Sequence, residues 1–156
     1  MADPALKRPD EPGLYERDFY EWSQETARAL REGRLGDLDI ENVAEEIESL
    51  GRSDKREIRN RLGVLLVHLL KWRFQPEARS GSWRGTIVTQ RRKIRELIEE
   101  SPSLRRFPAS LLAAEHADAR RLAAIEAGLP IESFPELCPF RIEQVLDEDF
   151  LPENDR

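Results

Sequence analysis

The chain has 156 residues, of which 39% are hydrophobic and 36% are charged, and its formal net charge is -6. This length and apolar content predict one domain with its own core, and the net acidity disfavours a general nucleic-acid binder, because affinity for phosphates comes from clustered Lys and Arg. The single cysteine, Cys138, excludes an internal disulfide and a thiolate zinc cluster. No apolar run reaches the roughly 20 residues that span a bilayer, so we expect no membrane insertion.

The N-terminal 13 residues are polar and rich in proline, without the apolar core of a secretory signal. We therefore interpret 1–13 as a disordered tail, 14–152 as a single helical domain and 153–156 as a second tail. The absence of a signal, together with the lone thiol, favours a cytoplasmic location.

The first predicted helix begins at Asp18, where an Asp cap with Glu21 three residues later resembles a capping box, and ends at Gly33. Its expected inner face consists of Phe19, Trp22, Ala29 and Leu30.

The second predicted helix is capped by Asp39 and stopped by Gly51. Its apolar residues recur at spacings of three and four, namely Ile40, Val43, Ile47 and Leu50. A third helix is predicted from Ser53 to Phe74. Because its second half is apolar nearly all round, that helix is expected in the middle of a bundle.

A fourth helix is predicted from a Ser82 cap to Ser101-Pro102, and a fifth, rich in alanine, from Ala109 to Ala127. Pro108 is expected to separate the fifth helix from a short turn around Leu104. A two-turn helix around Ile142, Val145 and Leu146 should then cover the others. The sequence thus predicts an all-α, single-domain bundle of about five helices with a short C-terminal capping helix.

The densest acidic cluster is Glu41, Glu45, Glu46 and Glu48. Paired glutamates on bundle helices can bind divalent metals, but matching ligands from other helices are needed, and no Glu-x-x-His pair supplies them. At about 100° per residue, three of these glutamates project away from the apolar side, and only Glu46 flanks it. We therefore predict no metal site and no cofactor.

Polar residues on the apolar third and fourth predicted helices are the main candidates for chemistry. His68, Lys71 and Gln75 lie on adjacent turns, and Gln90 projects into an apolar face, where a buried amide needs hydrogen-bond partners. Two interpretations remain open: a saturated polar network that fixes helix register, or a small pocket in which His68 acts as acid, base or ligand. The full candidate cluster is Glu46, His68, Lys71, Trp72, Gln75, Trp83, Gln90 and Arg91.

Two further features are weaker candidates. Basic residues gather between Arg84 and Arg95 and between Arg52 and Arg61, so a local surface for nucleic acid is conceivable, although no helix-turn-helix signature accompanies it. Cys138 precedes Pro139 at a predicted helix start, where a helix dipole could lower its thiol pKa; a structural or capping role is the favoured interpretation.

Several motifs, taken in chain order, resemble those of the bacterial family called domain of unknown function twenty-nine. They are Tyr15-Glu-Arg-Asp-Phe-Tyr-Glu-Trp22, Asp39 to Gly51, His68-Leu-Leu-Lys-Trp72 with Gln75-Pro76, Ser82-Trp83 with Gln90-Arg91, Ser101-Pro-Ser-Leu104, Phe134-Pro135, Cys138-Pro139 and Asp149-Phe-Leu-Pro152. The resemblance implies a compact helical fold in a bacterial cytosolic protein, and it brings no activity.

No catalytic signature accompanies these motifs. The leading hypothesis is a non-enzymatic helical module that binds a protein partner or forms a homo-oligomer. The alternative is an enzyme or small-ligand binder that uses a polar pocket around His68 and Gln90, and nucleic-acid binding through the Arg84 to Arg95 surface is third.

Overall fold

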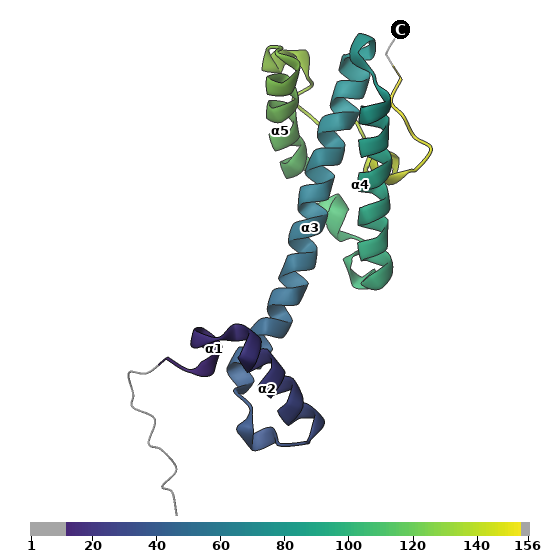
Figure 1. The fold of residues 1–156 in the computed structure, drawn as a ribbon. Helices are drawn as coiled ribbons and strands as arrows, with labels where there is room; N and C mark the ends of the chain where they lie inside the picture. Colours follow the sequence, from purple (N-terminus) through teal and green to yellow (C-terminus); the bar gives the residue numbers. More distant parts are fainter. Residues whose placement is uncertain (1–11, 154–156) are drawn as a thin grey trace, which may run out of the picture. The chain divides into compact units, whose positions relative to one another are not determined.

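The computed structural model describes residues 12–153, and every regular element in that range is helical. The helices are α1 (Leu14–Arg17), α2 (Phe19–Arg31), α3 (Ile40–Phe74), α4 (Gly81–Glu100), α5 (Phe107–Ala127) and α6 (Ile142–Leu146) (Figure 1). From α2 onward, each connection between successive helices contains one 3₁₀ turn. The all-α prediction is confirmed. Most of the two predicted tails, 1–13 and 153–156, lies outside the described residues.

The chain divides into two compact units, an N-terminal unit that ends at Gly51 and a C-terminal unit that begins at Arg52. The assignment of 14–152 to one domain stays a prediction. No helix in residues 12–153 is both long and apolar enough to cross a membrane.

The second and third predicted helices are a single helix of 35 residues, α3, so the predicted stop at Gly51 is wrong. Glycine ends a helix most readily when it adopts a left-handed conformation, and among the described residues only Gly33 and Gly128 have positive φ, +70° and +65°. Gly51 instead stays inside the helix, which costs about 1 kcal/mol relative to Ala. Asp39 does accept from the backbone N–H of Asn42 at 3.3 Å, as a capping residue should.

The N-terminal unit has a very small core. The Asp18 side chain caps α2 by accepting from the Glu21 N–H at 2.9 Å, as predicted. Among the expected inner residues of α2, Trp22 and Ala29 are buried, whereas Phe19 and Leu30 are about half exposed, so that part of the prediction is wrong. Trp22 and Ala29 are also the only buried hydrophobic residues in the described part of this unit.

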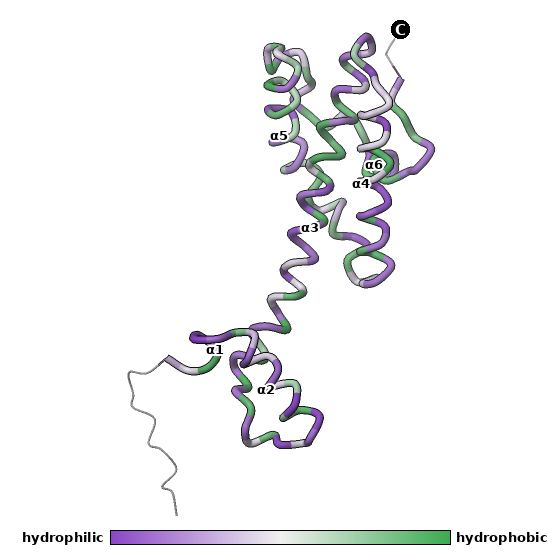
Figure 2. The backbone as a smooth tube through the Cα atoms, viewed as in Figure 1, coloured by the Kyte–Doolittle hydropathy of each residue, from purple (hydrophilic) through white to green (hydrophobic). Residues whose placement is uncertain are grey.

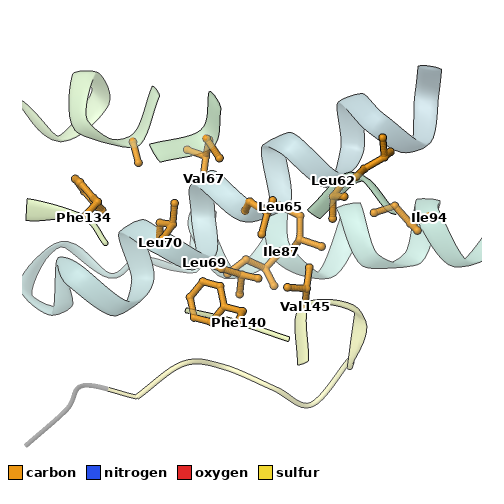
Figure 3. Packing of buried hydrophobic residues seen from close by; sticks show 14 of the residues in the cluster. Leu62, Leu65, Val67, Leu69, Leu70, Ile87, Ile94, Phe134, Phe140 and Val145 are labelled. Atoms are coloured by element: carbon orange, nitrogen blue, oxygen red, sulfur yellow. The ribbon is translucent and has the colours of Figure 1, made fainter. Parts of the chain in front are cut away.

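The C-terminal unit holds the main hydrophobic core, which is built around the second half of α3 (Figure 3). The core residues of α3 are Leu62, Leu65, Leu66, Val67, Leu69 and Leu70; Ile87 and Ile94 of α4, four residues of α5, Phe134, Phe140 and Val145 pack with them. Because α3 is covered from several sides, its apolar residues can point nearly all round, as expected for a central helix.

The starts of α4 and α5 differ from the prediction by about two residues. Ser80, rather than Ser82, caps α4, because its Oγ accepts from the Trp83 N–H at 3.2 Å. The first residue of α5 is Phe107, and Pro108 lies in its first turn, where the missing N–H has no intrahelical acceptor to lose.

Three arginines hold the C-terminal segment against the helices through its backbone carbonyls. Arg91 of α4 donates from Nε to Val145 O at 2.8 Å and from Nη2 to Gln144 O at 3.3 Å. Arg120 of α5 donates to Phe134 O at 2.9 Å, and Arg79 donates to Pro152 O at 3.4 Å. These bonds, with fully buried Val145, fix α6 over the core, so the predicted capping helix is confirmed.

Candidate functional site

The eight residues of the predicted polar cluster do not converge on one cavity. Glu46 lies in the N-terminal unit, where its Oε1 accepts from the Tyr15 hydroxyl at 2.5 Å. This hydrogen bond is the main cause that raises the pKa of Tyr15 to about 12. The remaining seven residues lie in the C-terminal unit, in several separate contacts.

Lys71 is the most buried of the predicted α3 residues. Its Nζ donates to Glu126 Oε2 of α5 at 2.7 Å and lies 4.4 Å from the centre of the Trp83 ring. An anionic and an aromatic partner together satisfy the buried ammonium. Lys71 and Trp83, two members of the candidate cluster, are thus brought together, and Glu126 is a partner that the sequence did not indicate.

His68 and Gln90 are both half-buried, and each forms a hydrogen bond with a residue outside the candidate cluster. The His68 Nδ1 lies 2.8 Å from Val64 O on its own helix, and Gln90 Oε1 accepts from Arg61 Nη1 at 3.2 Å. Gln90 and Arg61 line an open polar groove of about 410 Å³ between α3 and α4, and His68 does not line it. The pocket around His68 and Gln90 therefore stays a prediction.

Arg91 and Trp72 take part in backbone contacts. Arg91 is 3% exposed, and burial lowers the pKa of its guanidinium. Trp72 offers its carbonyl to Arg79 Nε at 2.7 Å, and the same guanidinium lies 5.2 Å from the Trp72 ring centre. The spacing of Arg91, four residues after Ile87 and three before Ile94, could have indicated a core-facing position.

Two other titratable groups are buried, and neither has the features of a catalytic site. His116 of α5 is 2% exposed, burial lowers its pKa, and its Nε2 has no hydrogen-bond partner among the described residues. Burial raises the pKa of the half-buried Cys138 thiol, whose Sγ contacts Phe140 O at 3.4 Å. A raised thiol pKa disfavours the thiolate, which is the nucleophilic form.

The first half of α3 exposes apolar residues of the kind that a helical bundle normally covers. Ile40, Ile47 and Leu50 were expected to face inward, but they are 65%, 64% and 70% exposed. We call these three residues the apolar stripe. On the same stretch the half-buried residues are Asn42, Val43, Glu46 and Ser49, so this part of α3 turns a more polar side inward.

Exposed apolar side chains are concentrated in the N-terminal unit as a whole. Among the described residues, seven of the thirteen large exposed hydrophobic side chains belong to it: Phe19, Tyr20, Leu30, Leu35, Ile40, Ile47 and Leu50. Figure 2 shows hydrophobic positions recurring along the start of α3. Concentrations of this kind mark interaction sites more often than single exposed residues do.

Three of the four glutamates at the start of α3 are exposed. No group of three or more potential His, Cys, Asp or Glu ligands occurs within residues 12–153. Glu41, Glu45 and Glu48 are exposed, in agreement with the predicted solvated face.

Comparison with known proteins identifies a family. The family model described as "Domain of unknown function DUF29" matches residues 14–151. The chain therefore belongs to this family, whose description names no activity. No curated protein and no solved structure gave a significant match.

Proposed function

We propose that this member of the DUF29 family is a non-enzymatic helical module that associates with a second copy of itself through its N-terminal unit. The observation that carries the proposal is the exposed apolar stripe, Ile40, Ile47 and Leu50, on the first half of α3. A reducing bacterial cytoplasm remains the expected setting, as the single cysteine suggests.

The size of the N-terminal unit supports association. Its described part, 12–51, buries two hydrophobic residues, Trp22 and Ala29, alongside an aromatic group in which the Tyr15 and Trp22 ring centres lie 4.8 Å apart. So few buried hydrophobic residues give this unit little stability of its own. Covering its exposed apolar side chains with a second copy would add to that stability.

The spacing of the stripe favours another helix of the same kind as the partner. The stripe residues recur at intervals of seven and three, the spacing at which paired helices bury a shared seam. Most soluble oligomers are symmetric homo-oligomers in which the same patch meets itself. A second copy supplies an equal apolar stripe without a further protein being required.

Sedimentation velocity over protein concentrations from about 1 to 200 μM tests the proposal. We expect the full chain to form a dimer with a dissociation constant inside that range. The double variant Ile47→Asp with Leu50→Asp should raise the dissociation constant at least about 100-fold, because two carboxylates would be buried in an apolar seam.

The matched control places the same charges on the other unit. Ile125 and Leu137 are 76% and 82% exposed, and Ile125→Asp with Leu137→Asp should leave dimerisation unchanged. A wild-type chain that stays monomeric at the highest concentration, or a control pair that dissociates it equally, would refute self-association through the stripe.

A further inference from the structure

A basic cleft lies where α3 passes the start of α5, within the C-terminal unit. It has a volume of about 320 Å³ and is lined by Arg52, Lys55, Arg56, Arg59 and Phe107. The four basic residues follow one another at spacings of three, one and three, so they share one face of α3. No acidic residue is part of the lining.

The positive charge of the cleft is only partly compensated within the chain. Arg59 Nε lies 3.6 Å from Glu115 Oε1 of α5, and Arg52 also has an interaction partner. The Lys55 ammonium lies 5.2 Å from the centre of the Phe107 ring, and Arg56, which is exposed, forms no ion pair within residues 12–153. Like charges at these spacings repel one another, so an anion in the cleft would relieve the repulsion.

The N-terminal end of α5 adds positive charge next to the cleft. The helix starts at Phe107 with no side-chain cap and no acidic residue in its first turn, and Arg105 and Arg106 precede it. The N-terminal end of a helix carries partial positive charge from backbone N–H groups that have no intrahelical acceptor. The N-terminal end of α5 and the basic residues of α3 therefore both make the electrostatic potential of the cleft more positive.

We propose that this cleft binds the phosphate chain of a nucleotide-like ligand, with the Phe107 ring against the ligand's aromatic part. Guanidinium groups match phosphate oxygens with paired hydrogen bonds. Phe107 is half-buried against the core, and the part of its ring that lines the cleft supplies an aromatic surface beside them. The site goes beyond self-association and is separate from it, because no residue of the apolar stripe lines the cleft.

The short length of the basic stretch favours a small ligand over an extended nucleic acid. From Arg52 to Arg59 the helix rises about 10 Å. The turns before it carry Glu41, Glu45, Glu46 and Glu48, and the whole chain has a net charge of -6, which opposes contact with a long polyanion.

Isothermal titration of the full chain with ATP, inorganic triphosphate and adenosine, at low and at physiological salt, tests the proposal. We expect ATP to bind with a dissociation constant of about 10–100 μM, triphosphate to bind more weakly, and adenosine not to bind measurably. Raising the salt concentration should weaken ATP binding, because the contacts are charged and exposed.

Variants with equal loss of charge localise the site. Lys55→Gln with Arg56→Gln should weaken ATP binding at least about tenfold. Arg92→Gln with Lys93→Gln, on α4, should leave it unchanged. Phe107→Leu should weaken ATP but not triphosphate, which separates the role of the ring from that of the charges. The Ile47→Asp, Leu50→Asp variant should still bind ATP, so failure of self-association leaves this inference intact.

Three results would overturn the inference. They are no ATP binding at millimolar concentration, equal weakening by the α4 control pair, and adenosine binding as tightly as ATP. A short single-stranded oligonucleotide that binds more than about tenfold tighter than ATP would assign the cleft to nucleic acid instead.

Discussion

The two halves of α3 both carry apolar residues at helical spacing, but their surroundings are opposite. In the second half, residues such as Leu62, Leu65 and Leu69 are fully buried by α4, α5 and the C-terminal segment. In the first half, Ile40, Ile47 and Leu50 recur at comparable spacing and are about two-thirds exposed. Periodicity thus indicates which residues of a helix share a side, but it does not show whether the same chain covers that side.

The largest effect should come from truncation in the covered half. Leu65→Ala should lower the free energy of unfolding by about 2–5 kcal/mol, because it leaves a cavity in a close-packed core. Ile47→Ala, measured at a concentration that keeps the chain monomeric, should change it by less than about 0.5 kcal/mol. Urea denaturation followed by circular dichroism measures both.

A concentration series sharpens this comparison. If Ile47 lies in a dimer interface, the cost of Ile47→Ala should grow as the protein concentration rises, whereas the cost of Leu65→Ala in the C-terminal unit should not. Equal costs for the two variants in the monomer would show that the two halves of α3 do not differ in the way their exposure indicates.

A smaller effect is expected from the ion pair in the covered half. Glu126→Gln should cost about 1–2 kcal/mol, because it removes the negative charge that faces the buried Lys71 ammonium and leaves a weaker, neutral acceptor in its place. This is less than the ~3–5 kcal/mol for a fully buried pair, since the Glu126 side chain is 40% exposed to screening solvent. Lys71→Met, which removes the charge and keeps the volume, should cost less than Glu126→Gln; the reverse order in thermal melts would contradict this explanation.

A stabilising substitution is expected at Gly51, between the two halves of α3. Gly51 lies inside α3, and a Cβ added there would meet no atom within 4 Å. Gly51→Ala should therefore raise the free energy of unfolding by about 0.5–1 kcal/mol. Gly128→Ala is the contrasting variant and should be destabilising, because Gly128 ends α5 with φ of +65°. A Gly51→Ala chain that melts below the wild type would mean that α3 is not continuous at this residue.

The smallest effect on stability at neutral pH is expected from substitution of His116 in α5. Burial, and secondarily the charge of Arg120, lower its pKa in the folded state below the usual value of about 6.5. The unfolded chain then takes up the proton first, so stability is complete above about pH 6.5 and falls as the pH drops below it. His116→Leu should flatten the melting temperature between pH 7 and 5 relative to the wild type. An identical slope in both proteins would assign the pH dependence to other groups.

The sequence predicted the helices well where the signal is local. The Asp18 cap, the Gly33 end, the Ala127 end of the fifth predicted helix and the Ser101-Pro102 stop all depend on residues within one turn, and they appear in the structure. The stop at Gly51 failed because a glycine is only permissive: whether it ends a helix depends on the conformation it adopts.

The site was harder to predict because partners came from distant residues. Lys71 pairs with Glu126, 55 residues away, and Gln90 with Arg61, 29 residues away. Polar residues on one helix face indicated a need for partners but not which partners would be present. The exposure of Ile47 and Leu50 was missed for the same reason, since burial depends on which elements pack against a face.

The way the three arginines hold the C-terminal segment bears on how this family can vary in sequence. Arg79, Arg91 and Arg120 donate to the carbonyls of Pro152, Val145, Gln144 and Phe134, and a carbonyl is present whatever side chain the residue carries. An exchange at Gln144 should therefore leave the bond to Arg91 intact and lose only the cap of α6, in which Gln144 Oε1 accepts from the Arg141 N–H at 3.0 Å. An insertion or deletion between Phe134 and Pro152 would shift the acceptors that follow it relative to those that precede it. Relatives should consequently preserve the length of this segment and the three arginines more strictly than its polar side chains.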